Sequence, residues 1–175
     1  MTMIVAALTG TSASASTAQS TSAGSAPFDP KSGRYAGSLT NGPARAPDTL
    51  AVSSDKAWAA LNQVYSQLGL SLSVVDTQTH VIGVLRGVQR RPVGGERLSR
   101  LLECGAGVYG PNADRYTVQL TALSYVQPTG NQGAVLDTRV SGSAAANGVN
   151  SAVNCASSGR LEELVYEMLR KALGQ

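Results

Sequence analysis

Two cysteines, Cys104 and Cys155, constrain the fold of this chain more than any other feature of its sequence. Each lies where a stretch of sheet-like residues meets a turn, and the two are far apart along the chain. An even number of cysteines predicts a disulfide, and a disulfide indicates an oxidising compartment. Two free buried thiols and redox chemistry are the alternatives, although a redox-active pair usually has Cys-x-x-Cys spacing. His80 is the only histidine, so the ligands of a closed zinc site are missing and no metal is expected.

The length and composition favour one globular domain with a tail. A chain of 175 residues has room for one ordinary domain. Only 14% of the residues are charged and 5% are aromatic, with a net charge of +3. Nucleic-acid-binding proteins concentrate far more lysine, arginine and stacking aromatics, so we expect no nucleic-acid partner. No stretch approaches the roughly 20 apolar residues that a membrane-spanning helix needs.

The first 48 residues read as a low-complexity arm. A short apolar run, Met3–Leu8, precedes a small-x-small pattern at 13–15, so residues 1–15 resemble the remnant of a signal peptide, although no lysine or arginine comes before the run. Serine, threonine, alanine and glycine dominate residues 9–26, and prolines and glycines continue to position 47. Such a composition cannot bury enough apolar surface to offset the cost of ordering. The cysteine pair and the remnant of a signal peptide favour an exported protein, periplasmic or extracellular. We expect its arm to extend along neighbouring subunits.

Residues 49–175 are predicted to form an α+β domain. Apolar residues at helical spacing predict a helix from Ser53 or Ser54 to a stop at Gly69, with Trp58 and Tyr65 in the core. A strand over 70–76 and a return strand over 80–88 follow as a hairpin. A loop and a short apolar element at 98–102 lead to strands over 115–126 and 134–144, and a small-residue loop leads to Cys155. An amphipathic helix over 160–173 ends the chain.

The order of these elements is α-β-β-β-β-α, which favours a two-layer fold. Two amphipathic helices, each with one apolar stripe, would cover one face of a four-stranded antiparallel sheet. The disulfide would then join the entry of the third strand to the entry of the last helix.

Three short patterns carry a resemblance to a known family. They are Asp-Lys-Ala-Trp at 55–58, Leu-Gly-Leu at 68–70 and Val-Val-Asp at 74–76. Over about residues 50–175 the chain resembles the helix-grip domains of bacterial envelope lipoproteins, such as the C component of the outer-membrane β-barrel assembly machinery. The resemblance implies a non-enzymatic scaffold role in an envelope complex. The chain departs from that family because it lacks the lipid-bearing cysteine and carries its own cysteine pair, and no binding residue is transferred.

No catalytic constellation is visible in the sequence. His80 has no partner at recognisable spacing, and an exposed histidine at a strand end is the simpler interpretation. The carboxylates occupy cap and turn positions, there is no Gly-x-Ser-x-Gly, and the glycines at 83–95 match neither a phosphate loop nor a dinucleotide fingerprint. We expect no enzyme, no catalytic residue and no cofactor.

One charge cluster remains, and all its basic residues are arginines. Glu96 is the only acid inside it. The cluster is either a solvated loop or a contact for an acidic protein surface or lipid headgroups, because arginine suits carboxylate and phosphate partners. Three tyrosines, Tyr109, Tyr125 and Tyr166, are further candidate interface anchors. The candidate partner-binding residues are Arg86, Arg90, Arg91, Arg97 and Arg100.

Two functional hypotheses follow. The first is a non-catalytic accessory subunit that docks on other protein subunits of a larger bacterial envelope or membrane complex, through its arm and its folded domain. The second is a stand-alone periplasmic module that binds a small or anionic ligand between sheet and helices.

Overall fold

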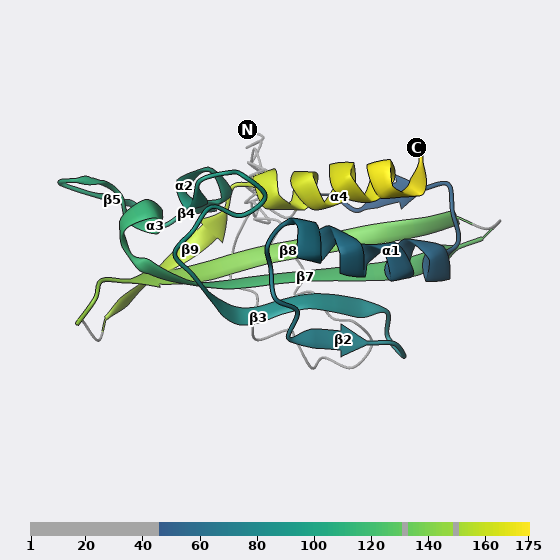
Figure 1. Ribbon diagram of the computed structural model, residues 1–175, viewed down its shortest axis with the longest axis horizontal. Coiled ribbons are helices and arrows are strands. Elements are labelled where there is room, and N and C mark those ends of the chain that lie inside the picture. The colour runs from purple at the N-terminus through teal and green to yellow at the C-terminus, as the bar shows by residue number, and fades with distance from the viewer. Residues whose placement is uncertain (1–45, 131–132, 149–150) are drawn as a thin grey trace, which may run out of the picture.

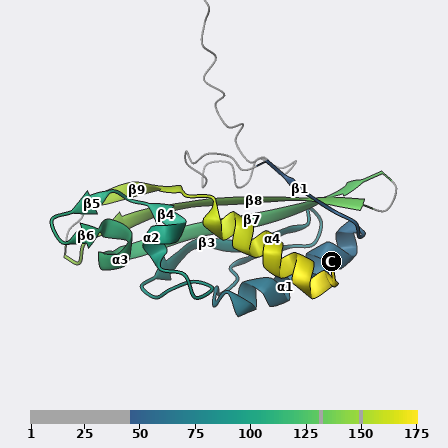
Figure 2. The same cartoon turned by 90° about the horizontal axis from the view of Figure 1, so that it is seen from above.

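Residues 46–130, 133–148 and 151–175 are described by a computed structural model, in which an antiparallel sheet carries two long helices on one face (Figure 1). Figure 2, the view from above, places both helices on the same side of the sheet. The predicted α+β class is therefore confirmed. In chain order the elements are β1 (Asp48–Leu50), α1 (Ser54–Gln67), β2 (Val74–Asp76), β3 (Val81–Gln89), α2 (Leu98–Leu101), β4 (Leu102–Glu103), β5 (Ala106–Gly107), β6 (Gly110–Pro111), α3 (Asn112–Arg115), β7 (Thr117–Thr129), β8 (Gly133–Ala145), β9 (Ala152–Ser157) and α4 (Arg160–Leu173).

The sheet has more strands than the four predicted. Its order is β2-β3-β7-β8-β9-β4, and β1 also pairs with β8. The long hairpin of β7 and β8 forms the centre, in register from Thr117 opposite Ala145 to Thr129 opposite Gly133. On the other side of β8, β1 pairs with residues 134–136 and β9 with residues 142–145. The prediction of four strands and two helices is thus corrected by three short strands in this sheet, a separate two-stranded ribbon of β5 and β6, and two short helices.

Two further corrections have local causes. The loop expected to lead to Cys155 instead enters β9 at Ala152, because the small residues of β9 give no alternating apolar signal and its pairing depends on β8. The strand expected from position 115 begins at Thr117, because residues 112–115 form the short helix α3. The strand expected over 70–76 is regular only from Val74.

The core lies between the two long helices and the sheet. From α1 it takes Ala57, Leu61, Val64 and Tyr65, all fully buried, as predicted for Tyr65. Alternate residues of β7 and β8 face these helices, because successive strand residues point to opposite faces. From α4 the core takes Leu161, Val165 and Leu169.

Trp58 lies at the rim of this core rather than inside it. It is partly buried, and its ring stacks on that of His80 at 5.6 Å between centroids. Its indole nitrogen Nε1 is buried without a hydrogen-bond partner among the described residues. The prediction that Trp58 packs in the core therefore holds only for part of its side chain.

A short polar chain crosses the middle of the core. The hydroxyl of Tyr65 lies 3.3 Å from the carbonyl oxygen of Ala122, to which it donates, and 2.9 Å from Oγ of Ser124. Ser124 lies 2.8 Å from Oγ1 of Thr138 on the next strand. Burial raises the pKa of Tyr65 well above its usual range. The tyrosine is therefore a neutral, hydrogen-bonded core residue, and the chain joins α1 to β7 and β8.

The sheet face opposite the helices carries a second, smaller apolar cluster. It consists of Val74, Val81, Leu123 and Tyr125, with Leu85 at its margin. The predicted arm, residues 1–48, lies outside the described residues except for its last three positions.

Candidate functional site

The disulfide braces one end of the sheet. Cys104, which follows β4, and Cys155, which lies within β9, form a disulfide as predicted. The two strands that carry them also pair with each other, Leu102 opposite Ser157. The bond therefore joins the exit of β4 to the middle of β9, rather than two element entries as expected. It is compatible with a location outside the cytoplasm.

A small hairpin projects from this braced end. Strands β5 and β6 form a two-stranded ribbon just after Cys104, and Figure 1 shows it pointing away from the sheet. Its tip residues are strongly exposed, Val108 at 95% and Tyr109 at 79%. The side chain of Asn112 donates to the carbonyl oxygen of Cys104 at 3.1 Å, and its backbone N–H donates to that of Gly105 at 3.0 Å. The result is an apolar tip on a fixed base.

A cation lies over the aromatic ring of the tip. The guanidinium carbon of Arg115 is 5.1 Å from the ring centroid of Tyr109, within the range of a cation–π contact. Of the three tyrosines considered as interface anchors, Tyr109 is the largely exposed one. Tyr125 is only 9% exposed and belongs to the second apolar cluster, and Tyr166 is partly buried against the main core.

Three of the five predicted arginines meet at one hollow. It has a volume of about 260 Å³, and the residues around it come from the loop after β3, from α2 and from α3. The carboxylate of Asp114 accepts hydrogen bonds from the backbone N–H and the hydroxyl of Ser99, at 2.9 and 2.6 Å. The lining thus combines three arginines with one carboxylate that is already hydrogen-bonded. We call this the arginine hollow; its lining is Arg90, Arg91, Pro92, Arg97, Leu98 and Asp114.

The other two predicted arginines do not line the hollow. Arg86 lies in a bulge of β3, at a φ of +52°, and its backbone N–H donates to Oγ1 of Thr121. Arg100 is 3.6 Å from Glu96. The sequence analysis missed Arg160, which is 3.5 Å from the same carboxylate. The acid inside the cluster is therefore already shared by two arginines outside the hollow.

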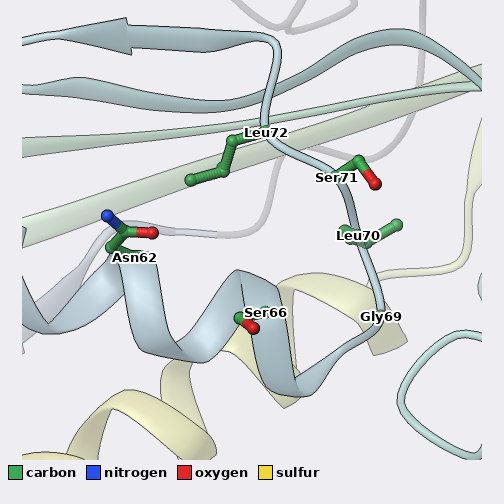
Figure 3. Close-up of a pocket in the computed structure, with 6 residues that line it drawn as sticks. All are labelled: Asn62, Ser66, Gly69, Leu70, Ser71 and Leu72. Carbon is green, nitrogen blue, oxygen red and sulfur yellow. The ribbon is translucent and has the colours of Figure 1, made fainter.

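A second hollow, drawn in Figure 3, lies between α1 and the segment that leads into β2. Its volume is about 380 Å³. The lining carries neutral amide and hydroxyl groups beside two leucines, so it offers hydrogen bonds but no titratable group. It is lined by Asn62, Ser66, Gly69, Leu70, Ser71 and Leu72.

His80 is not the unpartnered histidine that the sequence suggested. It lies just before β3 with its side chain 27% exposed, and its Nε2 is 3.4 Å from Oδ1 of Asp55. The ring of Trp58 stacks on the imidazole. The arrangement ties the start of α1 to the start of β3. Among the described residues, no group of three or more histidines, cysteines, aspartates or glutamates could hold a metal ion. None of the helices described here is long and apolar enough to cross a bilayer.

No protein-family model matches this chain, and neither a curated protein nor a solved structure matches it significantly. The resemblance to helix-grip domains therefore stays a prediction, and the functional argument depends on the residues themselves.

Proposed function

We propose that this protein is an exported, non-catalytic accessory subunit that docks on an acidic surface of a larger bacterial envelope or membrane complex. The observation that carries the proposal is the gathering of Arg90, Arg91 and Arg97 around one hollow. Export, to the periplasm or beyond, is supported by the disulfide.

The charges of the arginine hollow are available to a partner. Arg91 and Arg97 are exposed, and neither forms an ion pair with another described residue. Arg90 is held in place by hydrogen bonds from its Nε to Thr117 at 3.0 Å and from its Nη2 to Asn147 at 3.5 Å. Guanidinium groups bind carboxylates through two parallel hydrogen bonds and are weakly hydrated, which suits them to interfaces.

Charge alone makes a modest contribution to such a contact. An exposed ion pair stabilises by about 0–1 kcal/mol, so three arginines chiefly orient the partner and speed its encounter. Further affinity must come from other surfaces, and the N-terminal arm is the other part of the proposal. This part of the proposal depends on the composition of the arm, because low-complexity segments with few large apolar residues can wrap large partner surfaces.

A cross-linking experiment tests the proposal. A photoreactive amino acid replaces Pro92, which lines the hollow and leaves every arginine in place. The matched control carries the same group at the exposed Lys171 on α4. In living cells of the source bacterium, position 92 should yield a defined adduct with one envelope protein, absent from position 171. Identical adducts from both positions, or none from position 92, would contradict the proposal.

The hollow also favours a second candidate, a module that binds a small anion. A hollow of about 260 Å³ lined by three arginines could hold one phosphate or carboxylate, although ligand pockets usually exceed about 300 Å³. Calorimetry with inorganic phosphate and with citrate distinguishes the candidates. One-to-one binding that disappears in Arg97→Ser would favour the anion-binding module over the docking subunit.

A further inference from the structure

We infer that the β5–β6 hairpin and the arginines beside it form a binding end for anionic lipid bilayers, with Val108 and Tyr109 entering the headgroup region. This inference goes beyond the proposed docking on a protein, because it assigns a lipid ligand to a second feature of the same end.

The hairpin tip is built for shallow insertion. Val108 and Tyr109 are the two residues between β5 and β6, and they are almost fully exposed. Glycines flank them at 107 and 110, so the tip is narrow, and Gly110 has a φ of +111°, which side chains rarely adopt. Single exposed apolar residues are ordinary on protein surfaces, but two at the end of a projecting turn form a wedge.

Arg115 gives the tip the second property that a headgroup layer requires. Its guanidinium lies over the Tyr109 ring and has no ion pair with any described residue. Tyrosine favours the membrane–water boundary, where its ring meets acyl chains and its hydroxyl meets water. Arginine beside it can contact lipid phosphates bidentately. Tyr109 therefore supplies an apolar anchor, and Arg115 supplies a group that binds lipid phosphate.

The arginine hollow extends this basic surface. Asp114, which lines the hollow, is the chain neighbour of Arg115. Figures 1 and 2 place β5, α3 and α2 at the same end of the molecule. Each arginine near an anionic leaflet strengthens binding by about fivefold. This end of the molecule therefore carries four arginines, three around the hollow and one over the Tyr109 ring: Arg90, Arg91, Arg97 and Arg115.

A bilayer fits this tip better than a protein pocket. A specific protein interface buries about 800 Å² on each partner, far more than two side chains supply, whereas a headgroup layer needs no complementary shape. The disulfide and Asn112 fix the base of the hairpin, so insertion requires little ordering of the chain.

Vesicle binding tests the inference. The full chain is mixed with vesicles of equal parts phosphatidylcholine and phosphatidylglycerol, or of phosphatidylcholine alone, and bound protein is measured by flotation. We expect binding to the anionic vesicles, a weakening of about tenfold or more in Val108→Ser/Tyr109→Ser, and a loss of about fivefold in Arg115→Ser. The control Val75→Ser removes an exposed valine from β2 and should bind like the parent.

A fluorescence probe reports insertion directly. Tyr109→Trp is made in a background in which Trp58 is replaced by phenylalanine, so one indole marks the tip. Its emission should shift to the blue with anionic vesicles and be quenched by brominated lipid. No binding by the parent, equal binding by the tip variant, or an unshifted indole would overturn the inference. Failure here together with a Pro92 adduct would overturn lipid binding by the tip and leave the docking proposal intact.

Discussion

Removal of the disulfide should lower the stability of the domain by about 4 kcal/mol. The bond closes a loop of 51 residues, and the loss of chain entropy in the unfolded state scales with the logarithm of that length. Both cysteines are buried, so the test replaces them with alanine, because a buried serine hydroxyl would add a desolvation cost. A domain is stable by about 5–15 kcal/mol in total, so the expected loss is large but need not unfold the protein.

The assay is urea unfolding of three samples: the oxidised parent, the reduced parent and Cys104→Ala/Cys155→Ala. The reduced parent is the matched control, because it retains both sulfur atoms without the crosslink. We expect the reduced parent and the double variant to show similar free energies of unfolding, both about 4 kcal/mol below the oxidised parent. A difference below about 1 kcal/mol would refute the loop-entropy reasoning. A changed slope against urea would show that the crosslink also compacts the unfolded chain.

Three further predictions concern the fold. A Cβ atom at Gly83, whose φ is +157°, would collide with the carbonyl of Ala122. Gly83→Ala should therefore lower the free energy of unfolding in urea by about 2–4 kcal/mol, whereas Gly130→Ala, with open space around it, should lower it by about 0.5 kcal/mol or less. Equal effects of the two substitutions would refute this packing. Trp58→Phe removes a buried N–H without a described partner, so it should lower the free energy of unfolding by less than about 1 kcal/mol, whereas Trp58→Ala should lower it by about 2–3 kcal/mol. Equal losses in the two variants would place the whole indole in the core. Burial favours the neutral form of Tyr65, so the free energy of unfolding should decrease as the pH rises above about 10, where the tyrosine ionises in the unfolded chain. The decrease should be smaller in Tyr65→Phe. The same alkaline profile in the parent and in Tyr65→Phe would contradict this prediction.

The elements best predicted from the sequence are those whose apolar and polar residues follow the period of a helix or a strand. The helix expected over 160–173 is α4 with the same bounds, and the strand expected over 134–144 is β8, one residue longer at each end. The apolar residues of α4 recur at helical spacing, and Leu136 and Val140 of β8 share one face while Asp137 and Arg139 lie on the other. Strand β9 has one valine among small residues, so its pairing with β8 is a tertiary property that no local pattern carries.

The candidate site was predictable only where its residues are close together in the sequence. Arg90, Arg91 and Arg97 meet because one loop turns back on itself, and a cluster in the sequence anticipated this. Arg160 reaches Glu96 across the fold, and sequence spacing could not reveal that contact. Nor could it separate Tyr109 from Tyr125, since their exposure depends on which tip or face each occupies.

The central claim, that the arginine hollow is a docking surface, is tested most directly by the salt dependence of binding to membranes isolated from the source organism. Arg91→Ser/Arg97→Ser is compared with Lys56→Ser/Lys171→Ser, which removes the same charge from the two long helices. Both variants should unfold at the parent's urea midpoint. At low ionic strength the arginine variant should bind more weakly than the parent and the lysine variant should not, and this difference should shrink as the Debye length falls below about 8 Å. Equal binding by the parent and both variants at low ionic strength would contradict the account and make the cluster a solvated loop.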